Sequence, residues 1–131
     1  MHRSRLSTVF IDCGPDAFDA GVSFWSGALG KQVMPVNESY RTLRGRVGGA
    51  GGPYVGLQRV PAEERAVHLD IETDDIEREV ARLERLGARV KARIRGHVVM
   101  VAPSGHPFCV VSVHRPDFAE HSTLWPDDVD Q

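Results

Sequence analysis

The stretch Val67-His68-Leu69-Asp70-Ile71, followed by residues 74–87, decides how this sequence folds. Apolar and polar side chains alternate through its first five residues, which predicts a strand with one buried face. The following residues carry apolar side chains at helical spacing, with Asp74 as the expected N-cap, Glu77 at the capping-box position and Gly87 at the end. The expected apolar face of this helix is Ile76, Val80, Leu83 and, less regularly, Leu86. The stretch therefore predicts a strand that leads into an amphipathic helix.

The same arrangement occurs near the N-terminus. Val9-Phe10-Ile11-Asp12 aligns with Val67-His68-Leu69-Asp70 at an offset of 58 residues, and residues 29–33 align with residues 86–90 at an offset of 57. A helix is expected between the two N-terminal segments, with Asp16 as its cap and Gly30 at its end. Its expected apolar face is Phe18, Val22, Trp25 and Leu29. The repeat predicts two copies of one supersecondary unit that pack together.

One strand is expected before the helix of each copy and three strands after it. In the first copy these are residues 7–13, then 32–36, 39–45 and 54–60; in the second they are residues 66–72, then 89–95, 98–102 and 108–113. Residues 45–53 hold five glycines and are expected to form a loop, because no phosphate-binding fingerprint occurs there. The predicted class is α+β, built from two βαβββ modules.

The domain organisation follows from this repeat. We expect one domain over residues 1–131, with module one at about residues 7–60 and module two at about residues 66–114. The tail, residues 115–131, is expected to lie over the surface with Trp125 as an anchor. In residues 89–95, Val90, Ala92 and Ile94 are expected to face inward, and the four alternating cations are interpreted as a solvated face of the sheet.

Composition excludes several classes of partner. The net charge is −2 and the sequence pI is about 6.3, so no nucleic-acid partner is expected. No run of 18 apolar residues exists, so no membrane span is expected, and the basic start lacks the apolar stretch of a secretory signal. The two cysteines, Cys13 and Cys109, form neither a disulfide framework nor a C-x-x-C site, which predicts a cytoplasmic protein.

Strand parity assigns the side chains to faces. The apolar set of each first strand must meet its helix, and the residues between them must face the other way. The residues expected to meet the helices are Val9, Ile11, Cys13, Val67, Leu69 and Ile71. His68 and Asp70 in the second copy, and Phe10 and Asp12 in the first, are expected on the opposite face of the sheet.

Four short motifs add to the repeat. They are Phe24-Trp25-Ser26-Gly27-Ala28-Leu29-Gly30, Leu57-Gln58-Arg59-Val60, His68-Leu69-Asp70 and residues 102–111, A-P-S-G-H-P-F-C-V-V. In this order and spacing, over about residues 7–113, the chain resembles the vicinal oxygen chelate superfamily, and within it the glyoxalase-like proteins of the glyoxalase, bleomycin-resistance and dioxygenase type. The resemblance implies that the two βαβββ modules pair into a cup-shaped mixed sheet with helices outside. It also implies a small-molecule ligand or substrate and a homodimer.

The resemblance further implies metal ligands on the first and last strand of each module. Those places fall near Phe10, Gln58, His68 and Cys109. His68 and Gln58 are candidate ligands for a divalent metal, but Phe10 cannot coordinate, and Cys109 stands where the family usually has Glu. Asp12 would replace Phe10 only if the strand shifted by one pleat repeat. No cofactor is therefore assigned, although a divalent metal stays a candidate.

Three functions stay open. The first is binding of a small organic molecule in the cup, without the usual complete metal site. The residues expected to contact that molecule are His68, Gln58, Phe10, Asp12, Cys109 and Tyr40. Tyr40 and its neighbour Arg41 must face opposite ways, so only one of them can line the cup. The alternatives are a metal-dependent lyase, isomerase or dioxygenase, and a non-catalytic interaction domain; whether the chain is an enzyme stays open.

Overall fold

The computed structural model describes residues 1–34, 39–64 and 66–127, so the predicted strand and turn residues 35–38 lie outside it. Two compact units are present: the first unit is Thr8–His68, and the second unit is Met1–Ser7 with Leu69–Gln131. The chain is α+β, with parallel and antiparallel strand pairs in a mixed sheet. Its elements are β1 (His2–Cys13), α1 (Phe18–Leu29), β2 (Val33–Met34), β3 (Tyr40–Leu43), β4 (Tyr54–Arg59), β5 (Val67–Thr73), α2 (Ile76–Arg85), β6 (Arg89–Ile94), β7 (His97–Val101), β8 (Pro107–Ser112), α3 (Phe118–His121) and β9 (Thr123–Trp125).

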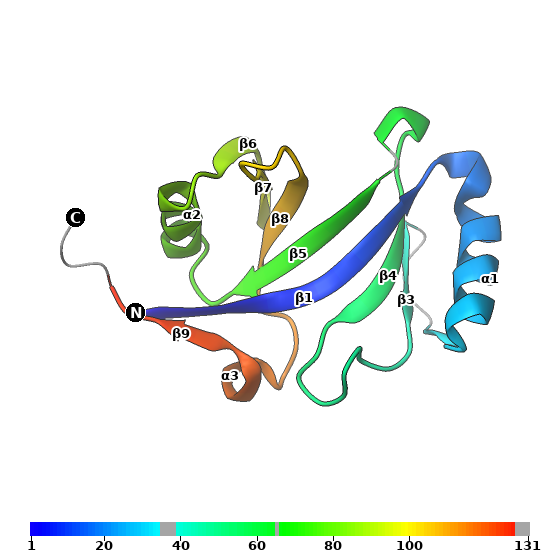
Figure 1. Ribbon diagram of the computed structural model, residues 1–131, viewed down its shortest axis with the longest axis horizontal. Helices are drawn as coiled ribbons and strands as arrows, with labels where there is room; N and C mark the ends of the chain where they lie inside the picture. Colours follow the sequence, from blue (N-terminus) through cyan, green and yellow to red (C-terminus); the bar gives the residue numbers. More distant parts are fainter. Residues whose placement is uncertain (35–38, 65, 128–131) are drawn as a thin grey trace. The chain divides into compact units, whose positions relative to one another are not determined.

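The first unit has the strand order β2-β3-β4-β1. β1 and β4 are parallel, whereas β3 is antiparallel to both β2 and β4. α1 lies along one face of this sheet (Figure 1), where Phe18, Leu43 and Leu57 are fully buried in one cluster. The partly buried residues around that cluster are Ile11, Cys13, Val22, Trp25 and Val55. The predicted helix-facing positions Ile11 and Cys13 are therefore confirmed.

α1 begins and ends at positions fixed by its flanking residues. Pro15–Ala17 forms a 3₁₀ turn, and Ala17 is the N-cap without a side-chain hydrogen bond. The prediction that Asp16 caps the helix is therefore wrong, because Asp16 lies inside the 3₁₀ turn that starts at Pro15. Gly30 ends the helix in the left-handed conformation, at φ 65°, as predicted. Leu29 is 44% exposed, so the buried face of α1 stops at Trp25.

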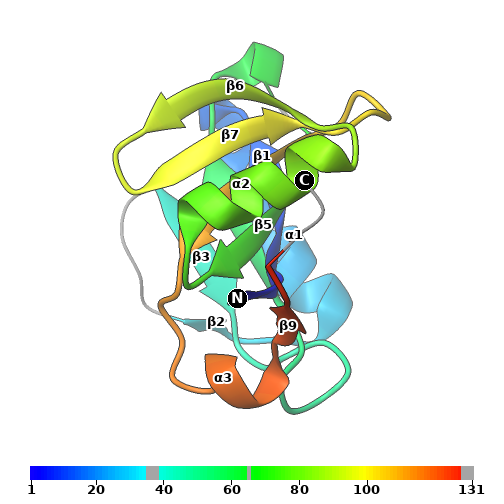
Figure 2. The ribbon, with the colours of Figure 1, turned by 90° about the vertical axis from the view of Figure 1, so that its left-hand side faces the viewer.

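The second unit repeats this connectivity in the order β5-β8-β7-β6. β5 and β8 are parallel, as β1 and β4 are in the first unit, which confirms the predicted βαβββ repeat. α2 lies beside β6 and β7 (Figure 2) and packs on a core of buried side chains from α2 and the sheet. These buried residues are Val80, Leu83, Val98, Met100 and Val110.

Three predictions about β5 and α2 are wrong. The N-cap of α2 is Asp75, whose side chain accepts from the Arg78 backbone N–H, whereas Asp74 accepts from the Arg3 backbone N–H. Leu86 is 65% exposed, outside the apolar face. Val67 and Leu69 are 56% and 41% exposed, so of the predicted helix-facing residues of β5 only Ile71 packs against the core. The physical reason is that α2 contacts β6, β7 and β8 and leaves the start of β5 uncovered.

A register shift in β6 limits the alternation that its sequence predicts. β6 pairs with β7 antiparallel, and the pairing slips between Val90 and Ala92. Val90 packs against the core, but Ile94, beyond the irregularity, is 51% exposed. A bulge changes which side chains face the core, so the prediction that Ile94 lies inside is wrong.

β1 starts at His2, five residues before its predicted start, and this extension carries buried polar groups. His2 Nε2 lies 2.7 Å from Glu79 Oε1, and Arg5 Nε donates to Glu72 Oε1 at 2.6 Å. Glu72 and Glu79 are both 0% exposed. Hydrogen-bonded polar pairs replace apolar contacts here, so the extension shows no hydrophobic pattern.

The tail forms a helix and a strand that contact the rest of the second unit, whereas the sequence predicted only a segment lying over the surface. Phe118 of α3 is 6% exposed, and β9 pairs antiparallel with the N-terminal part of β1. Trp125 Nε1 donates to Ser4 Oγ at 2.9 Å, and the Arg82 guanidinium lies 3.9 Å from the Trp125 ring centroid. The prediction of Trp125 as an anchor is confirmed. Among the helices of the described residues, none has the length and apolar composition needed to cross a membrane.

Candidate functional site

The first unit presents a group of polar and aromatic side chains on the face of its sheet opposite α1. In β1, Ile11 and Cys13 pack on the α1 side, so Phe10 and Asp12 lie on the other. The strand register then places Gln58 beside Asp12 and Tyr40 beside Gln58, in one row across β1, β4 and β3. Side chains paired in register lie on the same face of a sheet. Four residues predicted as ligand contacts are therefore brought onto one face.

His68 joins this group through Asp12. His68 Nδ1 and Asp12 Oδ2 lie 2.6 Å apart, with only 11% of the imidazole and 9% of the Asp12 side chain exposed. The Asp12 backbone N–H also donates to the Ala66 carbonyl at 2.7 Å, which ties the end of β1 to the segment directly before His68. A carboxylate on Nδ1 sets the tautomer and the orientation of the ring. Nε2 is therefore the atom through which His68 can bind a ligand or move a proton.

Phe10 connects the imidazole to Tyr40. Its ring stacks on His68 at a centroid distance of 5.1 Å and an interplanar angle of 22°. The same ring meets Tyr40 edge-to-face at 6.3 Å and 84°. Gly56 pairs with Phe10 in the ladder, and a Cβ at Gly56 would lie 2.7 Å from Phe10 Cε1. The absence of a side chain at Gly56 thus gives the Phe10 ring its place.

The arginines of this sheet point the other way. Arg41 and Arg59 place their guanidinium groups over the Phe18 ring, at 5.5 and 4.7 Å from its centroid. The requirement that Tyr40 and Arg41 face opposite sides is met with Tyr40 beside Phe10 and Arg41 on the α1 side.

Burial raises the pKa of the Cys13 thiol, and the charge of Asp12 raises it further, so this thiol stays protonated at neutral pH.

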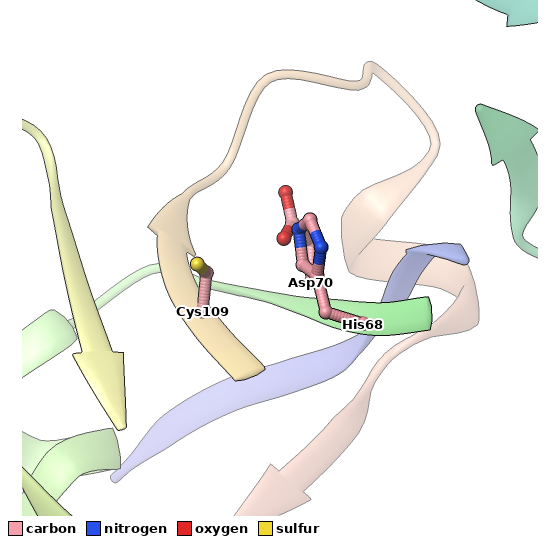
Figure 3. A group of neighbouring side chains, drawn as sticks. All are labelled: His68, Asp70 and Cys109. Atoms are coloured by element: carbon pink, nitrogen blue, oxygen red, sulfur yellow. The ribbon is translucent and has the colours of Figure 1, made fainter. Parts of the chain in front are cut away.

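Cys109 lies in a second constellation, on β5 and β8. The β5–β8 ladder pairs Cys109 with Asp70, and His68 precedes Asp70 by two residues on the same strand. One ligand atom from each of His68, Asp70 and Cys109 lies within 4.8 Å of the others (Figure 3). Imidazole, carboxylate and thiolate together are a donor set that zinc accepts. Asp70 was absent from the predicted ligands, although its parity with His68 along the strand already indicated it.

The four-strand ligand set implied by the family resemblance does not fit these residues. Phe10 occupies the first of its positions and stacks a carbon ring on His68. His68 and Gln58 keep ligand atoms, but Asp12, the potential replacement for Phe10, is hydrogen-bonded to His68 Nδ1. Only the group of His68, Asp70 and Cys109 brings three potential ligand residues together within the described residues.

Comparison with known families identifies the fold. The sequence profile of a family described as a glyoxalase-like domain matches residues 8–111. This chain belongs to the glyoxalase-like domain family. The family resemblance seen in the sequence is thereby confirmed, and the matched region reaches from the middle of β1 almost to the end of β8.

Solved structures are similar to this glyoxalase-like domain in fold. The Mn(II)-bound glyoxalase from Novosphingobium aromaticivorans has a TM-score of 0.57 at 18% identity, and the match covers 86% of this chain and 40% of that one. A glyoxalase/bleomycin resistance protein/dioxygenase superfamily member from Vibrio splendidus 12B01 gives 0.54 at 18%, covering 84% of this chain and 99% of that one. The 2,2′,3-trihydroxybiphenyl 1,2-dioxygenase from Sphingomonas wittichii strain RW1 has a TM-score of 0.51 at 22% identity, and the match covers 82% of this chain and 42% of that one.

This domain therefore spans less than half the length of two of these three proteins. At these identities the similarity shows a shared fold. No curated protein matches the sequence.

Proposed function

We propose that this glyoxalase-like domain binds a small organic molecule against the face of the first unit that carries Phe10, Asp12, Tyr40, Gln58 and His68. The observation that supports it most is the Asp12–His68 pair, buried beside two aromatic side chains. Small-molecule sites combine apolar or aromatic walls with a few oriented polar groups. Here the aromatic rings supply contact area, and the Asp12–His68 pair supplies a hydrogen-bonding group of fixed orientation.

A fragment screen by amide NMR tests this proposal. Fragments that bind here should shift the backbone amide signals of Phe10, Tyr40 and His68. Phe10→Ala should lower the affinity of these fragments at least about tenfold through loss of aromatic contact. Phe24→Ala is the matched control, because Phe24 is 61% exposed on α1 and meets Trp25 edge-to-face. Fragments that shift none of these amides, or that bind equally to both variants, would refute the proposal.

A second candidate, metal-dependent catalysis, is favoured by the group of His68, Asp70 and Cys109. Asp12 holds His68 Nδ1, so His68 would bind through Nε2, with Asp70 and Cys109 giving oxygen and sulfur. A metal bound there would supply a Lewis acid that polarises a substrate oxygen. The chain's own contribution is to orient the imidazole and to keep these donors together.

Metal content separates the two candidates. Purified protein exposed to Ni²⁺, Zn²⁺, Mn²⁺ and Fe²⁺ should, under the second candidate, retain one equivalent of metal and melt at a higher temperature. His68→Ala and Cys109→Ser should both lose that metal, whereas Cys13→Ser, which changes a thiol on the α1 side, should keep it. Absence of metal in the unmodified protein, or equal retention in all variants, would contradict the second candidate.

We also propose that the protein is a homodimer in the cytoplasm. Each unit has a strand at the end of its order, β2 in the first and β6 in the second, and exposed strand edges favour pairing with another chain. Light scattering of the purified protein should give twice the chain mass of 14.4 kDa. A monomer at all concentrations would refute this.

A further inference from the structure

Asp12 presents a carboxylate oxygen for which the structure provides no partner. Its Oδ2 accepts the hydrogen bond of His68, 2.6 Å away, while Oδ1 is buried without a hydrogen-bond partner among the described residues. The Asp12 side chain is only 9% exposed. Buried carboxylate oxygens in native proteins are almost always satisfied, because an unpaired one forfeits its solvation. Oδ1 therefore requires a donor from outside the described residues.

The positive charges of the neighbouring strands lie on the other face. Arg59 follows Gln58 on β4 and Arg41 follows Tyr40 on β3, so parity turns both away from Asp12. Their guanidinium groups lie over the Phe18 ring on the α1 side. The face with Asp12 thus carries a carboxylate that is hydrogen-bonded to the His68 imidazole.

Aromatic side chains share this face with the carboxylate. Phe10 precedes Asp12 by two residues on β1, and Tyr40 lies in the same row as Asp12 through Gln58. The faces of such rings carry negative potential and attract cations. The Gln58 amide adds an oxygen that can accept from a second N–H of a ligand. Carboxylate, amide and aromatic rings together are the chemistry that recognises a planar cation.

We propose that the ligand of this face carries a planar cationic nitrogen group, of the amidinium or protonated heteroaromatic amine class, which donates to Asp12 Oδ1. This rests on the proposed function, because it takes the same face as the binding site. The cation replaces the missing donor at Oδ1, lies against the Phe10–Tyr40 pair and offers its second N–H to Gln58. His68, held by Oδ2, keeps the carboxylate in place for it.

Three probes of one shape test the inference: benzamidine, benzamide and benzoate. They differ in charge and in the donors they offer. Each probe is titrated into the protein at pH 8 with EDTA present. Its affinity is measured by calorimetry, and its place of binding is read from the amide shifts of Phe10 and Tyr40. Benzamidine should bind at least about tenfold more tightly than benzamide, and benzoate should bind most weakly, because a charged donor strengthens the hydrogen bond to a carboxylate.

Asp12→Asn should remove the preference for benzamidine, since the amide keeps the shape of the carboxylate but not its charge. Asp16→Asn makes the same change of net charge at an exposed position of the same unit and should leave the preference intact. Equal binding of the three probes, or unchanged benzamidine binding by Asp12→Asn, would overturn the inference and leave the proposed function standing. No amide shift with any probe also overturns it, and the fragment screen then decides the proposed function separately. If Asp12→Asn does not fold, the comparison of the three probes on the unmodified protein decides alone.

Discussion

Replacing Gly56 by alanine should displace the Phe10 ring and destabilise the protein. Gly56 lies in β4 directly opposite Phe10, and its φ lies outside the left-handed region, so an alanine there meets no backbone strain. The new Cβ would lie 2.7 Å from Phe10 Cε1 and 3.0 Å from Cδ1. The substitution therefore acts through the ring of a neighbour, and its effect reports on how firmly that ring is held.

The size of the effect follows from the overlap. Carbon atoms in contact lie roughly 3.5–4.0 Å apart, so the ring must move by about 1 Å to accept the methyl group. Movement of this size forces the partly buried ring off its rotamer, and overpacking of this kind costs about 2 kcal/mol. The equilibrium constant for unfolding should rise about 30-fold. The stacking of Phe10 on His68 and its edge-to-face contact with Tyr40 are both disturbed.

Urea unfolding of a double-mutant cycle measures this. Gly56→Ala should cost about 2 kcal/mol in the unmodified background and less than about 1 kcal/mol when Phe10 is already leucine. A remainder is expected because the Cβ also lies 3.3 Å from the Arg41 carbonyl oxygen. Gly27→Ala is the matched control: nothing lies within 4 Å of its Cβ, so this change should stabilise α1 by about 0.5–1 kcal/mol.

Two results would refute the reasoning. If Gly56→Ala is as well tolerated as Gly27→Ala, the ring is not confined by the strand beside it. If the cost of Gly56→Ala is the same with leucine as with phenylalanine at position 10, the clash lies with backbone alone. In either case the claim that Gly56 gives Phe10 its place on His68 fails.

Three further predictions concern α2. Glu79→Gln should lower the free energy of unfolding in urea by about 3 kcal/mol, because it breaks a buried ion pair with Arg82. Glu84→Gln, at an exposed position, should change this free energy by less than about 0.5 kcal/mol. Similar losses in the two variants would contradict the prediction. Burial alone would raise the pKa of Glu79, but hydrogen bonds, first from Arg82, hold it below its ordinary value. Its stabilisation is therefore complete above about pH 4.3 and lost as pH falls through the lowered pKa, so the stability gap to Glu79→Gln should close on acidification, and a constant gap would refute it. Asp75→Ala should cost about 1 kcal/mol and Asp75→Asn much less, because the side chain accepts from the Arg78 N–H at 3.0 Å; equal losses in thermal unfolding would exclude a capping role.

The fold could be predicted from the sequence in those segments where apolar residues recur with the period of a strand or a helix. Ile11 and Cys13 reach the α1 side because β1 alternates there, and the repeat at offset 58 is retained in two parallel strand pairs. The first part of β1 could not be predicted in this way, because His2 and Arg5 are buried by pairing with Glu79 and Glu72 from distant segments. Polar pairs of this kind leave no periodic signal along the chain.

Strand parity could assign single residues of the candidate site to a face of the sheet, but it could not predict their arrangement. Parity placed Phe10 and Asp12 on one face, yet the register of β3 against β4 decides that Tyr40 and Gln58 join them. That register depends on the loop at residues 45–53, where turn geometry rather than hydrophobicity sets the pairing. The hydrogen bond of His68 to Asp12 likewise depends on strand pairing, which the sequence alone does not specify.

The repeat also explains why the two kinds of candidate chemistry involve different strands. At an offset of 58, Phe10 corresponds to His68 and Asp12 to Asp70, and the parallel ladders pair Asp12 with Gln58 and Asp70 with Cys109. The first copy therefore offers a ring, a carboxylate and an amide, whereas the second offers an imidazole, a carboxylate and a thiol. The first set is suited to a planar organic group and the second to a metal ion. Because Asp12 holds His68 Nδ1, the orientation of the second copy's imidazole depends on the first copy's carboxylate, and a change at Asp12 is expected to affect either function.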